Sequence, residues 1–489
     1  MNLGESLLGV QVVDNMRAVD LLVSLPFVDA DNLGATGASG GGNQTMWFAA
    51  LDERIKAALP MVSVGTFESA VMRSNCVCEL LPGGLTISET AGVLGLFAPR
   101  ALKMCNHEQD SNPTFYPQEM LRSYHNAKPV FQMYAAGENI DYAIFDLTHG
   151  YWEENREVML GWFDRHLKGT GTGAPKKERP FELLPVEELM VFEKGKRDPL
   201  VKNTAAYARG KGEELRKSFL NQAKFDAATK KEELRTLLKL NNRSERVNVH
   251  RYPESQGWER MALETNDGKL VPVLHHAPSG GAKAYTVISN MDGKNAIPSA
   301  ILDGLKANGS GIMIVELSGT GEASSAKDVT LTRLSRFHTL ARAHLWLGKT
   351  LMGEWVEELR LVTEFARDTY RPTKLRFDGN KEAGLAAVFL EAMHGGGYDE
   401  IIIRKAPVSY LFDKTENIDF FSMGIHLPGI LKWGDLSLAA ALTGTDISFI
   451  DPVTMSGEAL DDAQHKQYKA EYEKVRRLCG QVGQTTFNK

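Results

Sequence analysis

A run of small residues, Gly-Ala-Ser-Gly-Gly-Gly at positions 37–42, most tightly constrains how this 489-residue chain can fold. Residues 33–36 before it have a strand-like pattern, and residues 43–51 after it have the composition of a helix. A serine on a tight strand-to-helix turn has its hydroxyl exposed at the carboxyl edge of the sheet. The pattern therefore predicts a nucleophilic Ser39, with the backbone N–H of Gly40 directed toward a developing oxyanion.

Strand and helix patterns alternate on both sides of this turn. Residues 14–28 have apolar side chains at mostly helical intervals, and residues 153–167 are amphipathic. Further strands are expected at residues 55–64, 101–105 and 142–145. Strands that alternate with helices favour a parallel sheet covered on both faces, so we expect an α/β fold.

Composition suggests three parts of the chain. Residues 1–170 form the first α/β half, and residues 171–250 are expected to be a charged, partly helical connector. Within that connector, residues 211–240 alternate in charge as a solvent-facing helix does. Residues 251–489 return to the α/β pattern and include a long helical stretch at 334–368, broken near Gly348 or Gly353.

The second half repeats the order of elements in the first. Its strand patterns fall at residues 270–275, 285–289, 312–317, 375–377 and 401–404. A glycine turn at residue 379 leads from one of these strands into a helix, as in the first half. Lys381 stands where the first half has its serine, and an ordinary lysine cannot serve as the acyl nucleophile of this mechanism.

A nucleophilic serine needs a base that an acid orients, in the chain order Ser, acid, His. The polar loop at 106–111 follows a predicted strand and offers Glu108 or Asp110 as the acid. His149 follows the next predicted strand, where the base is expected. His107 and His125 are less well placed, one in the loop of the acid and one in a predicted helix.

Residues 32–169 resemble the α/β-hydrolases of the acetyl xylan esterase type, which include large two-domain members. The shared motifs are Thr-Gly-Ala-Ser-Gly-Gly-Gly-Asn-Gln-Thr at 36–45, Ala-Leu-Asp-Glu-Arg-Ile-Lys-Ala-Ala at 50–58, Asn-Cys-Val-Cys-Glu at 75–79, Phe-Ala-Pro-Arg at 97–100 and Phe-Asp-Leu-Thr-His at 145–149.

This resemblance implies a serine carboxylic ester hydrolase with Ser39 as nucleophile, Asp110 as orienting acid and His149 as base. It implies a small ester or an acylated polysaccharide as substrate, no metal or organic cofactor, and export in relatives. Cys78 and Glu79 could line the acyl or sugar pocket, with packing an equally good interpretation. The second half is then expected to be a degenerate hydrolase-like domain without a nucleophile.

The first half departs from this family in one respect. Only 38 residues precede Ser39, whereas complete α/β-hydrolases place several strands, and a second oxyanion donor, before the nucleophile. We therefore expect an N-terminally truncated first sheet. Its opening strands lie outside this sequence, or another domain or a second chain of a homo-oligomer supplies them, or this half is not catalytic. Residues 1–13 lack the pattern of a signal peptide, so the localisation stays open.

Charge and cysteine content exclude several classes of protein. Lys and Arg number 56 against 62 Asp and Glu, a net charge of -6, which argues against a nucleic-acid partner. No stretch reaches the roughly 18 apolar residues of a membrane span. The four cysteines are too few for a disulfide scaffold, and Cys76 and Cys78 are too close for the usual zinc knuckle.

Two alternatives from other classes remain. One is a catalytically inactive, hydrolase-like pseudoenzyme or a carbohydrate-binding scaffold. The other is a short-chain dehydrogenase using NAD(P), since residues 36–42 resemble a nucleotide-binding loop and Tyr124 and Lys128 mimic the catalytic pair. Against the dehydrogenase, Asn43 replaces the last glycine of the motif, and the next predicted strand does not end in an acidic residue.

Overall fold

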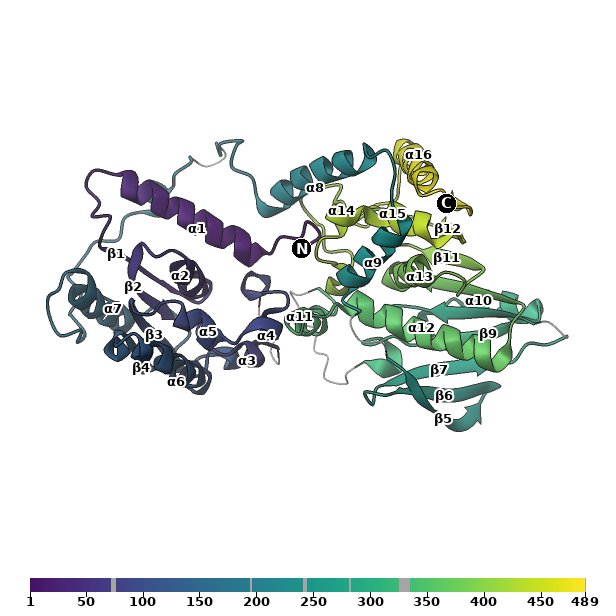
Figure 1. The fold of residues 1–489 in the computed structure, drawn as a ribbon, viewed down its shortest axis with the longest axis horizontal. Helices are drawn as coiled ribbons and strands as arrows, with labels where there is room; N and C mark the ends of the chain where they lie inside the picture. Colours follow the sequence, from purple (N-terminus) through teal and green to yellow (C-terminus); the bar gives the residue numbers. More distant parts are fainter. Residues whose placement is uncertain (72–75, 194–195, 241–243, 281–282, 325–334, 489) are drawn as a thin grey trace. The chain divides into compact units, whose positions relative to one another are not determined.

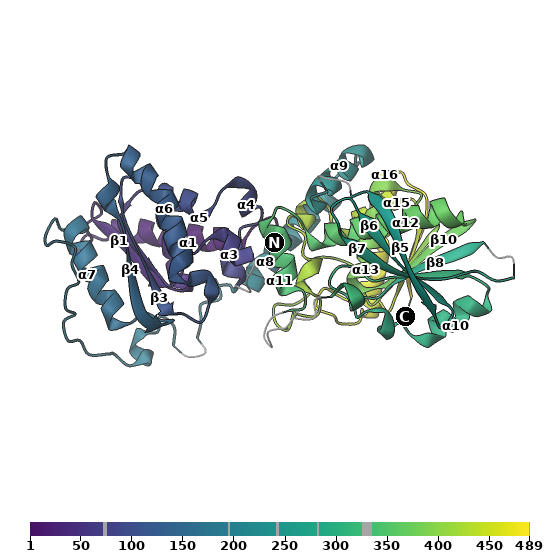
Figure 2. The same ribbon diagram turned by 90° about the horizontal axis from the view of Figure 1, so that it is seen from below.

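The computed structural model describes residues 1–71, 76–193, 196–240, 244–280, 283–324 and 335–488 (Figures 1 and 2). These residues form two compact units. We call the first unit Glu5–Pro199 together with Arg342–Gly348. The second unit consists of Met1–Gly4, Leu200–Ala341 and Lys349–Lys489.

The first unit is built on a four-stranded parallel sheet. Its strands are β1 (Leu33–Ala38), β2 (Ile55–Met61), β3 (Ala101–Gln109) and β4 (Ile140–Thr148), in the order β1-β2-β3-β4. All four strands were expected from the sequence. Because every strand runs in the same direction, the residues that follow them gather at one edge of the sheet.

Helices cover both faces of this sheet, and Figure 2 shows the strands between α7 on one side and α6 on the other. The helical elements are α1 (Leu7–Ser24), α2 (Gly40–Leu51), α3 (Phe67–Val71), η1 (Val77–Glu79), α4 (Gly84–Ile87), α5 (Thr90–Gly95), η2 (Pro113–Phe115), α6 (Pro117–Met133), η3 (Gly137–Asn139) and α7 (Glu153–Leu167). Trp162 of α7 packs with Leu59 of β2 and Cys105 of β3 in the core. The predicted α/β fold is confirmed.

Two helices differ in their bounds from the sequence prediction. Helix α1 begins at Leu7, well before the expected residue 14, because the Ser6 side chain accepts a hydrogen bond from the Gly9 N–H and caps the helix. Helix α2 begins at Gly40 rather than residue 43. Glycines are weak helix formers, so composition alone placed this start too late.

The second unit contains a nine-stranded mixed sheet in the order β13-β12-β11-β10-β8-β9-β7-β6-β5. The strands are β5 (Arg246–Ser255), β6 (Trp258–Thr265), β7 (Leu270–His276), β8 (Ala284–Ser289), β9 (Gly311–Val315), β10 (Lys374–Asn380), β11 (Glu400–Arg404), β12 (Asp446–Ile450) and β13 (Thr485–Asn488). The pairs joining β5, β6, β7 and β9 are antiparallel, and the other pairs are parallel.

Two helical stretches expected from the sequence each divide into two helices. The stretch expected at 211–240 forms two helices, α8 (Thr204–Leu220) and α9 (Ala227–Leu238). The longer stretch at 334–368 breaks at Gly348, which has a φ of +69°, between α11 (His338–Trp346) and α12 (Leu351–Tyr370). The remaining helical elements are η4 (Val186–Leu189) in the first unit, and η5 (Lys294–Ala296), α10 (Ser299–Ala307), η6 (Gly321–Ala323), α13 (Lys381–His394), η7 (Met423–Ile425), α14 (Ile430–Trp433), α15 (Asp435–Thr443) and α16 (Asp462–Cys479) in the second.

The two units share one feature of backbone conformation, a residue with positive φ between a strand and a helix. Ser39, between β1 and α2, has a φ of +57°, and Lys381, between β10 and α13, has a φ of +48°. The strand that follows each helix is also succeeded by a residue with positive φ, Val62 in the first unit and Lys405 in the second. Strands β10 to β13 lie in chain order, as β1 to β4 do. The second unit therefore repeats the hydrolase-like order of elements with lysine at the serine position.

Strand β1 lies at an edge of its sheet among the described residues, with β2 as its neighbour. The nine strands of the second unit form a separate sheet, so completion of the first sheet by the other domain receives no support. In the described part of the chain, none of the helices combines the length and the hydropathy needed to cross a bilayer.

Candidate active site

Ser39 occupies the strained turn between β1 and α2. Its φ of 57° and ψ of -122° lie in a region that residues with a side chain rarely adopt. Two neighbouring glycines make the turn possible. A Cβ on Gly37 would lie 2.6 Å from the carbonyl carbon of Gly41, and a Cβ on Gly42 would lie 2.5 Å from the Met61 oxygen. Backbone thus approaches backbone on both sides of Ser39, as a nucleophile turn requires.

The N-terminus of α2 begins next to this serine. Gly40 is the first helical residue, so its N–H is one of the donors that have no acceptor within the helix. The Ser39 N–H donates to the Met61 carbonyl oxygen over 2.9 Å, and the backbone carbonyl oxygen of Ser39 accepts from the Asn43 N–H over 2.9 Å. These bonds fix the turn against β2 and leave Gly40 available to an anion.

Asp110 and His149, the predicted acid and base, form a hydrogen-bonded pair. His149 Nδ1 lies 2.8 Å from Asp110 Oδ2, and Asp110 Oδ1 accepts the Asn112 N–H over 2.8 Å. The Asp110 side chain is fully buried, whereas 32% of the His149 side chain is exposed. With its Nδ1–H donated to the carboxylate, a neutral His149 ring presents Nε2 as a base. The Phe115 ring lies alongside it, at 6.4 Å between centroids.

A hydrogen-bond network holds the backbone just before His149. His107 Nδ1 lies 2.7 Å from the Thr148 oxygen, and His107 Nε2 lies 3.0 Å from Asn155 Nδ2. The Trp152 indole N–H donates to the same Thr148 oxygen over 2.9 Å. The prediction that His107 lies in the loop of the acid is wrong, because His107 lies within strand β3.

Ser39 and His149 follow the two outer strands of the sheet, which are three strand spacings, roughly 14 Å, apart. The segment after His149 crosses part of this span, since the Tyr151 hydroxyl lies 3.0 Å from Thr36 Oγ1 in β1. Thr36 Oγ1 itself donates to the Leu59 oxygen, so Tyr151 is the donor to Thr36. Among the described residues Ser39 Oγ makes no hydrogen bond of its own. The structure thus joins Asp110 to His149 and places Ser39 at the same sheet edge.

The other candidate acid and base lie elsewhere. Glu108 is exposed near the end of β3, and His125 is exposed on α6. Tyr124 and Lys128 are neighbours along α6, where Lys128 Nζ donates to the Tyr124 oxygen over 2.6 Å. Their contact follows from helical spacing, and the dehydrogenase alternative receives no support.

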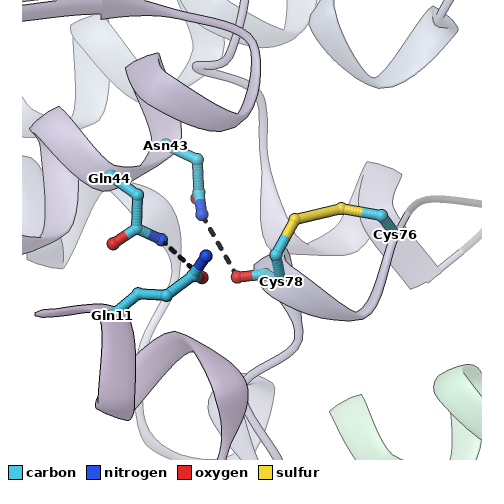
Figure 3. The surroundings of a disulfide bond; sticks show 5 residues. All are labelled: Gln11, Asn43, Gln44, Cys76 and Cys78. Carbon is cyan, nitrogen blue, oxygen red and sulfur yellow. Dashed lines mark hydrogen bonds between the residues drawn. A yellow bond between two sulfur atoms is a disulfide. The ribbon is translucent and has the colours of Figure 1, made fainter. Parts of the chain in front are cut away.

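Cys76 and Cys78 form a disulfide beside α2, which the sequence prediction missed (Figure 3). The Asn43 side chain donates to the Cys78 carbonyl oxygen over 3.4 Å. Sulfur atoms of this pair and a Glu79 oxygen lie within 4.8 Å of one another, but the disulfide leaves no thiolate to bind a metal. Asn75, part of the same sequence motif, lies outside the described residues. The close spacing of Cys76 and Cys78 was the only feature of the sequence that could have indicated this disulfide.

A small cavity of about 30 Å³ adjoins these residues in the first unit. Asn43 and Glu79 line it, whereas Cys78, which accepts the hydrogen bond from the Asn43 side chain, is not one of the lining residues. Burial lowers the pKa of the Arg342 guanidinium, and the nearby Glu79 carboxylate raises it. The effect of burial is the larger one, so the pKa falls to about 10. Glu79 thus has a charged neighbour from a distant part of the sequence.

The comparisons with known proteins bear on the segment that carries Ser39. Residues 9–72 match the acetyl xylan esterase family. This match confirms the resemblance for that segment and relates it to carboxylic ester hydrolases. Asp110 and His149 lie beyond the matched residues. None of the curated protein sequences matches the chain.

Solved esterase structures align with this chain at low sequence identity and low TM-scores. A candidate acetyl xylan esterase from Bacteroides fragilis aligns with a TM-score of 0.42 at 13% identity, over 61% of this chain and 84% of the other. An acetyl xylan esterase from a Paenibacillus species aligns with a TM-score of 0.36 at 8% identity, over 56% and 92%. The glucuronoyl esterase catalytic domain from Hypocrea jecorina aligns with a TM-score of 0.28 at 18% identity, over 35% and 54%. None of these structural similarities is close enough to assign a function to this chain.

Proposed function

We propose that the first unit is a serine ester hydrolase in which Ser39, His149 and Asp110 act together. The hydrogen bond between the buried Asp110 carboxylate and His149 Nδ1 carries this proposal. It fixes the tautomer that a base at Nε2 requires, at the sheet edge where Ser39 occupies its turn. A buried carboxylate paired with a partly exposed imidazole also differs from the solvated loop groups that an inert site would contain.

In this mechanism His149 Nε2 removes the proton from Ser39 Oγ as the oxygen attacks the ester carbonyl. The tetrahedral oxyanion lies near the Gly40 N–H at the start of α2. The protonated imidazole then gives its proton to the departing alkoxide, which leaves an acyl-serine. Water, deprotonated by the same nitrogen, releases the acid and restores Ser39. Asp110 stays ionised and stabilises the imidazolium throughout.

The substrate that we propose is an acetyl or other small acyl ester on a polysaccharide. The family match over residues 9–72 supports this class of substrate. Release of acetate from acetylated xylan, followed by chromatography, measures it directly. Hydrolysis of 4-nitrophenyl acetate with no release from acetylated xylan would limit the proposal to small soluble esters.

A fluorophosphonate probe tests the catalytic assignment, because it reacts with a serine only when that serine is activated. We expect one adduct on the whole chain, located at Ser39 by peptide mass spectrometry and absent from Ser39→Ala. His149→Asn should slow labelling severely, while His125→Asn, on the exposed face of α6, should label as the wild type does. A folded wild-type protein that stays unlabelled would instead favour the inactive, carbohydrate-binding scaffold.

A further inference from the structure

The small cavity of the first unit is lined by one residue that contacts Ser39 and by another that contacts His149. The backbone N–H of Asn43, which lines it, donates to the backbone carbonyl oxygen of Ser39. Phe115, which also lines it, has its ring alongside His149. A group held in this cavity would therefore be part of, or attached to, a substrate that occupies the active site.

Two polar side chains that line the cavity lack a hydrogen-bond partner in the described part of the chain. Ser63 is 5% exposed and Trp346 is 1% exposed, and both line the cavity. Neither Ser63 Oγ nor Trp346 Nε1 has a hydrogen-bond partner within the described residues. Leaving a buried polar group unsatisfied costs about 1–3 kcal/mol, so most such groups in folded proteins have a partner. Two of them around one cavity indicate that a polar guest belongs there.

The indole of Trp346 is held rigidly. It packs against Phe67 at 4.7 Å between ring centroids, and Phe67 in turn stacks on Trp47 at 5.9 Å. A Cβ on Gly84 would lie 2.4 Å from a carbon of the Trp346 ring, so the backbone of α4 presses directly on the indole. Trp346 belongs to the segment Arg342–Gly348, which the chain contributes to the first unit from far along the sequence.

We propose that this cavity is a hydroxyl subsite of the ester hydrolase, receiving one hydroxyl group of the carbohydrate part of the substrate. The inference rests on the proposed function. An indole N–H only donates, whereas a serine hydroxyl also accepts, so a guest that both accepts and donates satisfies the two groups together. A sugar hydroxyl does this: its oxygen accepts from Trp346 Nε1, and its proton goes to Ser63 Oγ.

The size and chemistry of the cavity argue against an acyl chain as its guest. A volume of about 30 Å³ holds one small group. An aliphatic chain would leave Trp346 Nε1 and Ser63 Oγ unsatisfied, at the cost given above. An ordered water would satisfy both groups as well, and it is the competing occupant that the experiment must separate from a substrate hydroxyl.

The experiment compares two esters in the whole protein. One is a methyl xyloside carrying a single acetyl group and free hydroxyls, and the other is 4-nitrophenyl acetate, whose leaving group has no further hydroxyl. We expect Trp346→Phe to lower the ratio of their kcat/KM values (xyloside over 4-nitrophenyl ester) about tenfold, as the loss of one substrate hydrogen bond does. Ser63→Ala, which removes a single heavy atom, should lower the same ratio. This second variant keeps the test valid if Trp346→Phe does not fold.

Trp162→Phe is the matched control. Trp162 Nε1 is also buried without a partner in the described residues, but Trp162 packs with the sheet core and does not line the cavity. Its replacement should leave the ratio as in the wild type. An unchanged ratio in both Trp346→Phe and Ser63→Ala would overturn the subsite and favour a resident water.

The proposed function has a separate readout in the same assay. Wild-type hydrolysis of 4-nitrophenyl acetate that disappears in Ser39→Ala supports the proposed function whatever the ratio. If the folded wild-type protein cleaves neither ester, this result contradicts the proposed function and, with it, the proposed hydroxyl subsite.

Discussion

The buried His107 ring lies 2.7 Å, through Nδ1, from the carbonyl oxygen of Thr148, the residue before His149. His107 touches no substrate in the proposed mechanism, so it is a positioning residue. We predict that His107→Gln lowers kcat roughly ten- to a hundredfold with little change in KM, because small displacements of a base are costly. Steady-state kinetics on 4-nitrophenyl acetate measures the effect.

The two amide replacements of His107 separate positioning from packing. In His107→Asn the amide nitrogen can occupy the place of Nδ1 and still donate to the Thr148 oxygen. In His107→Gln the amide nitrogen occupies the place of the imidazole Nε2, which faces Asn155 and not Thr148. A smaller loss of kcat in the asparagine variant supports positioning through Thr148, whereas equal losses would point to general disruption of the core.

Asp110 offers a second prediction, because its two oxygens have different partners. In Asp110→Asn the amide oxygen can keep the Asn112 N–H, and the NH2 group then faces His149 Nδ1. Two donors cannot face each other, so the imidazole must adopt the wrong tautomer. We expect kcat to fall by about 10⁴, as it does in established serine triads. The exposed acid of the same segment gives the control, since Glu108→Gln should keep wild-type kcat.

Much of this site could be predicted from the sequence because parallel strands bring their carboxyl ends together. Ser39, Asp110 and His149 each come directly after a strand of the same sheet, at positions the strand patterns indicated. His107 was misplaced for a physical reason. It and its neighbour Asn106 are polar, which suggests a loop, yet both are fully buried in β3. Their hydrogen bonds to distant groups, which compensate for burial, leave no trace in local sequence.

Long-range contacts account for the other omissions. Trp346 lies in a helical stretch of the second half, and only tertiary contacts assign it to the first unit. Strand β5 is largely exposed along its length, so it lacks the apolar pattern by which strands are recognised. Strands β7, β8, β9, β10 and β11 were found at nearly their observed bounds, whereas β6 and β12 were missed although both have residues buried in the core.

The glycines around Ser39 are not equivalent, which gives a prediction on stability. A Cβ on Gly42 would lie 2.3 Å from Ser63 Oγ and 2.5 Å from the Met61 oxygen, whereas a Cβ on Gly41 would meet nothing within 4 Å. We expect Gly42→Ala to destabilise the protein by about 1–3 kcal/mol and Gly41→Ala to be nearly neutral. Thermal unfolding of the two variants and the wild type compares them, and equal melting temperatures for both variants would contradict the geometry.

Thiol labelling tests the arrangement of the four cysteines. Cys105 is buried and burial raises its pKa to about 12, while burial of Cys479 raises its pKa to about 11. Neither therefore forms the reactive thiolate readily at neutral pH. We expect native protein to take up little maleimide, and treatment with a phosphine reductant to add two labels at Cys76 and Cys78. Fast labelling of these two residues without reductant would contradict the disulfide.

Acid should destabilise the second unit through His426. Burial lowers the pKa of this imidazole from 6.5 to about 4, and its Nδ1 lies 3.1 Å from Asn2 Oδ1. Between these two pH values the unfolded chain binds a proton that the folded chain does not, so stability is lost as pH falls from about 7 toward 4. The full effect is on the order of 3 kcal/mol. Chemical denaturation at several pH values should show a shallower pH dependence in His426→Gln than in the wild type. The partly exposed His465 on α16 provides the control, and a His465→Gln variant that flattens the dependence as strongly would remove His426 from this role.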